Sequence, residues 1–243
     1  MNVLQRVKAS HSYGFVMIFV ITTIVLAIAI PEASRWRAAI LVCQAITALL
    51  ACWTSDAPKR IFRLVVAFST VGVLGAIGIG IFGEAGSVLG RTANVLGVLL
   101  VAGVIMRGIA VDIRSQGVRG RAVAGALTIY LLFGTLFGFV YGLEQSLSGT
   151  PVLVATNSTL ESDGSTSANM YFSFVTLTTV GYGDLTPAGG ASRATAIFEA
   201  AFGQLYLVGI VATLAGALGK GKTAVEQELV GEPASAPQSS SEG

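Results

Sequence analysis

The chain has 243 residues and a formal charge of +2, with 53% apolar and only 12% charged residues. A soluble globular domain carries about 25% charged residues, and the mean hydropathy here is +0.75. This composition excludes an ordinary soluble protein and a chain that is disordered over most of its length. The small net charge also argues against a nucleic-acid-binding protein.

Six apolar runs, which carry few or no charges, follow one another along the chain, and each is a candidate membrane span. They cover residues 13–30, 38–53, 64–83, 92–106, 122–143 and 194–218. Two of them, 38–53 and 92–106, are shorter than the roughly 20 residues that cross a hydrocarbon core, so the pattern does not fix their ends. The first run also has the form of a signal peptide, but its apolar stretch is longer than usual. We therefore expect an all-α integral membrane protein with six transmembrane helices.

The basic residues indicate the orientation of these spans. With six spans, most Lys and Arg residues fall on the side that holds both termini, and only Arg35, Arg37, Arg91 and Arg193 fall on the other. Cytoplasmic loops carry an excess of Lys and Arg. The sequence therefore predicts a multi-pass protein of the plasma or inner membrane with both termini in the cytoplasm.

Three segments lie outside the predicted spans. Residues 107–121 form a basic connector, 144–193 a long external loop and 220–243 a short cytoplasmic tail, which from about Glu232 has the composition of a disordered segment. The connector has two interpretations. Its basic residues either follow the usual excess of Lys and Arg on the cytoplasmic side of a span, or they bind anionic lipid headgroups. The arginines that would bind the lipid are Arg114, Arg119 and Arg121.

The external loop contains the pattern that points to function. Residues 169–178 are apolar but too short to span, which predicts a re-entrant half-helix, and Thr179-Val180-Gly181-Tyr182-Gly183-Asp184 follows. Irregular backbone at membrane depth occurs only where it lines a wet cavity or is packed in protein. Alternate glycines permit backbone angles that turn successive carbonyls to one side. Such a row of oxygens, at the partly negative end of a helix, suits a weakly hydrated monovalent cation.

This order of helix, half-helix, TVGYGD hexapeptide and helix, over about residues 122–219, resembles the tetrameric potassium channels. The resemblance implies a pore domain at 122–219, behind a four-helix domain with a basic linker at 1–121, and four chains around one pore. It also implies K+ sites made by the carbonyls of Thr179, Val180, Gly181 and Tyr182 and the Thr179 hydroxyl, with Gly183 completing the filter. K+ is then the permeant ion, and no cofactor and no enzyme activity are expected.

Other residues are expected to support the filter. By resemblance, Tyr182 points its ring away from the pore, and Tyr171 and Phe172 form an aromatic cuff behind the filter. Only Tyr171 offers a polar tip, so we predict a hydrogen bond between Tyr171 and Asp184, with plain packing as the alternative. Thr178, directly before the filter, is grouped with these supporting residues.

Two residues of the last span are candidates for gating. Gly203 lies twenty residues after Gly183, where several family members have a hinge glycine, and close helix packing is the alternative. Glu199 is the one charged residue deep inside a predicted span, one turn before Gly203. It either bonds the pore helix or titrates during gating, or it is a buried carboxyl bonded to Thr or Ser side chains.

The six-span plan resembles voltage-gated potassium channels, but the fourth run, 92–106, contains no basic residue. Steep voltage dependence requires charges that cross the field, so we expect weak or no voltage dependence. Two alternatives remain open, namely a pore subunit of a potassium-uptake system and a non-conducting membrane scaffold. The uptake systems usually fuse four degenerate pore repeats in one chain, and here there is a single repeat with an intact filter.

Overall fold

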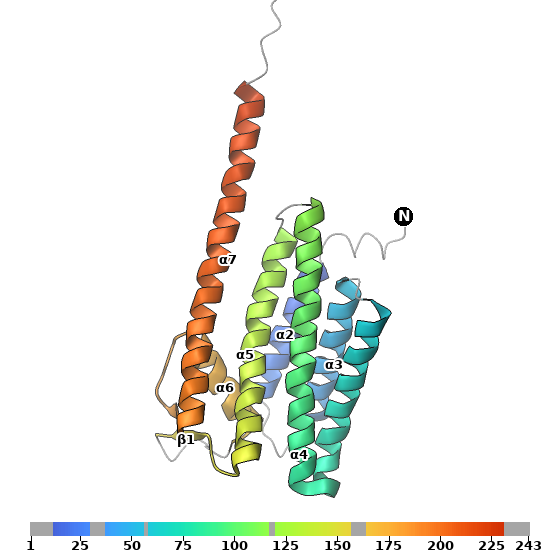
Figure 1. Ribbon diagram of the computed structural model, residues 1–243, viewed down its shortest axis with the longest axis vertical. Coiled ribbons are helices and arrows are strands. Elements are labelled where there is room, and N and C mark those ends of the chain that lie inside the picture. The colour runs from blue at the N-terminus through green and yellow to red at the C-terminus, as the bar shows by residue number, and fades with distance from the viewer. Residues whose placement is uncertain (1–11, 30–36, 56–57, 117–119, 157–163, 231–243) are drawn as a thin grey trace, which may run out of the picture.

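The computed structural model describes residues 12–29, 37–55, 58–116, 120–156 and 164–230. Figure 1 shows long helices side by side in one bundle, with the short helix α6 and the strands toward its lower end. The elements in chain order are α2 (Ser12–Ala29), α3 (Arg37–Thr54), α4 (Lys59–Gln116), α5 (Gly120–Ser148), β1 (Leu153–Ala155), α6 (Thr166–Leu177), β2 (Leu185–Pro187) and α7 (Gly190–Val230).

The first helix illustrates why these apolar runs pack as they do. Buried positions on α2 recur every three or four residues, which is the spacing of one helix face, and they include Tyr13, Val16 and Val20. The opposite face is also apolar but exposed, with Ile18 and Val25 more than half accessible. A helix that is apolar on all sides is typical of a segment that meets protein on one face and lipid on the other.

Helix α4 differs from the prediction. The sequence predicts two separate spans at 64–83 and 92–106, whereas the helix is continuous from Lys59 to Gln116. It turns back on itself at the lower end of the bundle (Figure 1), and Ser69 and Asn94 from its two halves line one cavity. The intervening chain has several glycines and no proline, so the backbone bends without ending the helix.

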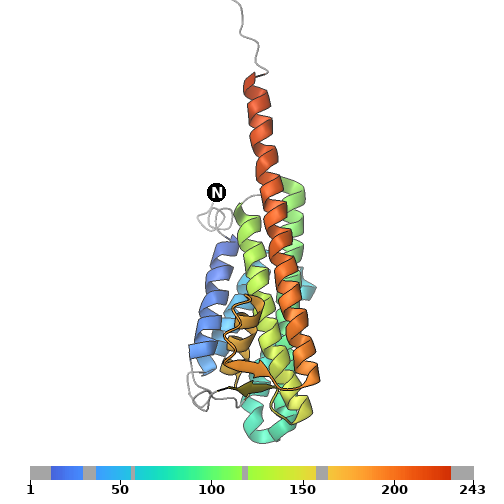
Figure 2. The ribbon, with the colours of Figure 1, turned by 90° about the vertical axis from the view of Figure 1, so that its left-hand side faces the viewer.

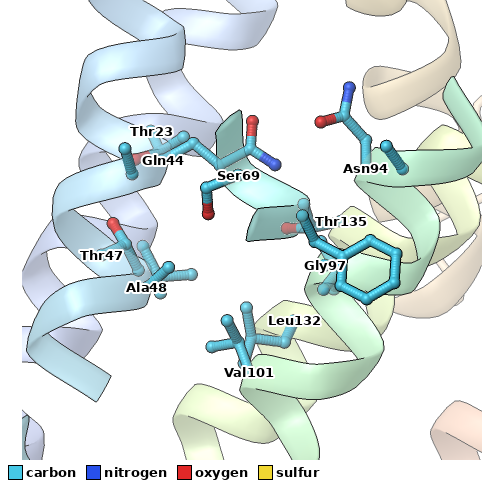
Figure 3. Close-up of a pocket in the computed structure, with 15 residues that line it drawn as sticks. Thr23, Gln44, Thr47, Ala48, Ser69, Asn94, Gly97, Val101, Leu132 and Thr135 are labelled. Carbon is cyan, nitrogen blue, oxygen red and sulfur yellow. The ribbon is translucent and has the colours of Figure 1, made fainter. Parts of the chain in front are cut away.

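A cavity of about 50 Å³ lies where α2, α3, α4 and α5 meet (Figure 3). Its polar lining residues are uncharged and include Thr23, Gln44, Asn94 and Thr135. A water molecule occupies about 30 Å³ in the liquid, so the space suits one or two waters. The cavity is therefore lined mostly by apolar side chains, and its polar side chains are uncharged.

The helices of the predicted pore domain are longer than their apolar runs. Helix α5 occupies residues that the sequence assigned to the connector and to the external loop, and α4 itself continues to Gln116. Helix α7 runs past the predicted limit at residue 218 to Val230, beyond the rest of the bundle in Figure 1. Its last turns contain Ala, Lys, Glu and Gln, which favour helix in water. Hydropathy marks where a helix leaves the bilayer and not where the helix ends.

Two short strands connect the chain before and after α6. β1 pairs antiparallel with β2, with Val154 opposite Thr186, and Figure 2 shows them beside the lower ends of α5 and α7. Leu153 and Leu185 are buried in a cluster with Phe137, Tyr141 and Phe172. The sequence predicts a loop here and not a sheet, because each strand has only three residues.

Within the described residues, two stretches are long and apolar enough to span a membrane, Gly90–Val111 and Val123–Ser148, and Tyr13–Ala29 and Cys43–Thr54 are shorter apolar helices. The expectation of a mostly helical protein is therefore confirmed, while the count of six spans stays a prediction. The lipid site at Arg114, Arg119 and Arg121 lies outside the side chains that the structure describes. The tail from Glu232 onward also lies outside the described residues.

Candidate functional site

The backbone of the TVGYGD segment alternates between two conformations. Thr179, Gly181 and Gly183 have φ angles of 58°, 57° and 75°, while Val180 and Tyr182 between them do not have positive φ. Thr179 is the one non-glycine residue with positive φ in the part of the chain that the structure describes. A β-branched residue in this region is strained, and such strain occurs at functional sites. The alternation turns successive carbonyls toward the same side of the strand.

Helix α6 holds the start of this segment. Ser165 caps its N-terminus, with the Oγ accepting from the Ala168 N–H at 3.1 Å. At the other end, the Val175 carbonyl accepts from the N–H groups of Val180 at 3.0 Å and Gly181 at 3.3 Å. The segment therefore begins directly at the helix C-terminus, where the helix dipole places partial negative charge.

The segment is uncovered in a single chain. Val180 is 52% and Tyr182 is 70% exposed, although both carry large side chains. Helix α7 presents further exposed apolar residues, with Ile197, Leu205 and Val208 each about two-thirds exposed or more. An apolar surface of this kind, next to the segment that would contact an ion, is typical of a protein–protein contact.

The outer end of the segment is fixed through Asp184. The predicted hydrogen bond is present, since the Tyr171 hydroxyl donates to Asp184 Oδ2 at 2.6 Å, and the Leu185 N–H donates to Oδ1 at 2.9 Å. The bond from Tyr171 holds the pKa of the Asp184 carboxyl below its usual value. The ring of Tyr171 also stacks on Tyr182, with centroids 6.5 Å apart and an interplanar angle of 6°.

The other two supporting residues lie elsewhere. Phe172 is buried against α5, where its ring meets Tyr141 edge-on at a centroid distance of 5.2 Å. It packs behind the pore helix, while Tyr171 contacts the end of the filter. The Thr178 hydroxyl donates to the Phe174 carbonyl at 2.6 Å, and the Thr178 N–H to the same carbonyl at 3.1 Å. Thr178 therefore closes α6 at the point where the filter begins.

Glu199 connects three helices. It is fully buried, and it contacts the Tyr141 hydroxyl of α5 at 2.8 Å and the Ser173 hydroxyl of α6 at 2.5 Å. Ser173 Oγ also lies 2.7 Å from the Gly134 carbonyl. Because a serine hydroxyl has one proton to donate, a neutral Glu199 that donates to Ser173 satisfies both contacts. The contact with the pore helix is present, and a role in gating stays a prediction.

Gly203 packs against the end of the pore helix. It is buried, and a Cβ at this position would lie 2.7 Å from Leu177 Cδ1 and 3.0 Å from the Leu177 carbonyl oxygen. The same carbonyl accepts from the Tyr130 hydroxyl at 3.0 Å. The helix is continuous through Gly203. Gly203 is therefore closely packed in this structure, and its role as a hinge stays a prediction.

Several residues at the site have no signal in the sequence. Tyr130, Tyr141 and Thr156 approach it from segments 47, 58 and 27 residues away along the chain. Of these contacts, only the need of a buried carboxyl for hydroxyl partners could be anticipated, and it does not identify Tyr141. Among the described residues, no three His, Cys, Asp or Glu side chains lie close enough together to hold a metal ion.

Comparison with known proteins assigns this region to a family. Residues 125–220 match a protein family described as ion channel, and the match contains most of α5 and α7 together with α6 and the TVGYGD segment. This part of the chain is therefore an ion-channel pore domain and not an enzyme. No curated protein and no solved structure matches the chain.

Proposed function

We propose that the chain is the subunit of a homotetrameric potassium channel of the plasma or inner membrane, through which K+ passes passively. The observation that carries this proposal is the alternation of positive φ at Thr179, Gly181 and Gly183 within an intact TVGYGD segment of an ion-channel domain. Rings of backbone carbonyls replace the hydration shell of K+ in such filters.

The ion sites would be formed by carbonyls of the residues 179–182 and by the Thr179 hydroxyl. Each site requires oxygens around the whole ion, and one strand supplies them from one side only. Four copies around a common axis would complete the rings, and the exposed side chains of Val180 and Tyr182 would become buried between copies. The exposed face of α7 would line the same interface and the inner cavity.

The described part of the four-helix domain supports weak voltage dependence. Between Arg91 and Arg107, α4 carries no charged residue. Arg91 donates to the Gly142 carbonyl of α5, which ties it to the outer helix of the pore. Moving one charge across the membrane yields about 2.3 kcal/mol per 100 mV. A domain without charges that cross the membrane therefore contributes little voltage-dependent free energy to opening.

The test is the reversal potential of the purified full chain in planar bilayers under opposed K+ and Na+ gradients, with voltage steps. We expect a reversal close to the potassium equilibrium potential and a shallow dependence of open probability on voltage. A reversal near zero would contradict selectivity. A preparation that is tetrameric in detergent but carries no K+ flux in liposomes would favour the scaffold alternative.

A further inference from the structure

We propose that Thr156 is a positioning residue for the outer end of the filter, an inference that rests on the proposed channel function. Its hydroxyl donates to the Gly183 carbonyl at 2.8 Å, and its N–H donates to the Asp184 carbonyl at 2.8 Å. One residue therefore engages the last two carbonyls of the TVGYGD segment.

The sheet explains how Thr156 reaches this position. Ala155 pairs with Leu185 in the antiparallel register of β1 and β2, so Thr156, the residue after β1, falls opposite Asp184. Leu153 and Leu185 are 1% and 6% exposed, which anchors both strands in the cluster behind α6. The place of Thr156 is thus set by a buried core and does not depend on the exposed Thr156 side chain itself.

Within one chain, packing does not confine Gly183 on the side where a Cβ would lie. Gly183 is in the left-handed region, and a Cβ built there would meet no atom within 4 Å. Within the chain, the contacts that orient this peptide are therefore its hydrogen bonds. The Thr156 hydroxyl holds the Gly183 carbonyl, while Tyr171 and the Thr156 N–H hold Asp184 on its carboxylate and its carbonyl.

This arrangement divides the carbonyls of the filter into two groups. The carbonyls of residues 179–182 remain available to ions, whereas the Gly183 carbonyl is directed toward Thr156. The Gly183 carbonyl therefore serves the frame of the outer mouth, and the row of ion sites ends at Tyr182. Without the hydroxyl, the Gly183 carbonyl loses its partner although Asp184 stays held, and the adjacent ring of Tyr182 carbonyls loses part of its support.

The first test compares three variants of the full chain in bilayers. Thr156→Val removes the hydroxyl and keeps the branched shape, whereas Thr156→Ser keeps the hydroxyl. The control is Thr186→Val, which removes a hydroxyl from the neighbouring sheet. That hydroxyl lies 3.5 Å from the Val154 carbonyl, away from the Gly183 carbonyl. A hydrogen bond of ordinary net strength corresponds to about a fivefold effect. We expect conductance during sustained opening to be lost three- to fivefold faster in Thr156→Val only, and raised external K+ to slow this loss.

The second test observes the bond directly and does not need current. Gly183-Asp184 is the only Gly-Asp pair in the chain, so labelling with carbonyl-¹³C glycine and ¹⁵N aspartate isolates the Gly183 carbonyl in solid-state NMR of the protein in liposomes. We expect this resonance to move in Thr156→Val and to stay in place in Thr156→Ser and Thr186→Val.

The two tests separate the two proposals. An unmoved Gly183 resonance in Thr156→Val, or a conductance time course equal to that of Thr186→Val in a selective channel, would overturn the role of Thr156. A wild-type reversal near zero would overturn the channel proposal, while the NMR result would still decide whether Thr156 holds the Gly183 carbonyl.

Discussion

Replacing Gly203 by Ala tests whether this glycine is a packing contact or a hinge. A new Cβ would lie 2.7 Å from Leu177 Cδ1, closer than carbon atoms approach one another without a shift, and 3.0 Å from the Leu177 carbonyl oxygen, which is a tight contact. Overpacking of this kind costs about 1–3 kcal/mol. Alanine in a helix interior, in contrast, is favoured over glycine by about 1 kcal/mol. The net effect of Gly203→Ala is therefore between no change and a loss of about 2 kcal/mol.

Gly209 supplies the matched control, because it lies on the same helix and a Cβ there would meet nothing within 4 Å. Gly209→Ala should stabilise by about 1 kcal/mol, so the two variants should differ by about 1–3 kcal/mol. The assay is thermal unfolding in detergent, followed by circular dichroism. Adding Leu177→Val removes the Cδ1 atom and should recover part of the loss in a double-mutant cycle. Equal stability of Gly203→Ala and Gly209→Ala, with a lower open probability only in the former, would refute the packing argument and restore the hinge.

Three further changes test the filter, its outer frame and the buried carboxyl. Gly181→Ala places a side chain on a residue with φ of 57°, a conformation that strains alanine even where space is open, so K+ flux should be lost. Gly97→Ala is the control, because Gly97 lies in a helix with equally open space around it, and flux should stay intact. Tyr171→Phe should return the pKa of Asp184 toward its usual value, measured by carboxyl NMR titration, and speed the loss of conductance in long openings. Because the folded pKa of Asp184 is lowered, the stabilisation from this bond is present above the unfolded pKa and is lost as pH falls through the folded value. This pH dependence should be smaller in the variant, in which the Leu185 N–H still donates to Asp184. Glu199→Gln should change the free energy of unfolding by less than about 0.5 kcal/mol, because an amide can make the same hydrogen bonds as a neutral carboxyl. The current of this variant should be insensitive to pH. A loss of about 1–3 kcal/mol in the free energy of unfolding would instead show that Glu199 is ionised.

The sequence predicts the filter because its determinants are local. The TVGYGD segment is contiguous, and the distance in sequence from Tyr171 to Asp184 is only 13 residues, so the half-helix and the filter are visible without knowledge of the fold. The contacts of Thr156 and Tyr141 depend on how the segments pack, and their types are common in any loop or span. Helix limits fail for another reason, since apolarity reports the lipid environment and the helix of α7 continues in polar sequence to Val230.

The same packing shows what the four-helix domain does for the pore. At the end of α2, the Ile28 carbonyl accepts from Ser167 Oγ at 2.6 Å, in the first turn of α6, and Arg91 of α4 donates to Gly142 near the end of α5. Both contacts hold the outer half of the pore domain, where the filter lies. A sensor that slides past the pore would have to break both contacts, and the described part of this domain carries no row of charges with which to do so. We therefore propose that α2 to α4 brace α5 and α6, and that opening of the pore involves α7. The lower part of α7 contacts the pore helix through Glu199 and Gly203, whereas its upper end extends beyond the rest of the bundle (Figure 1).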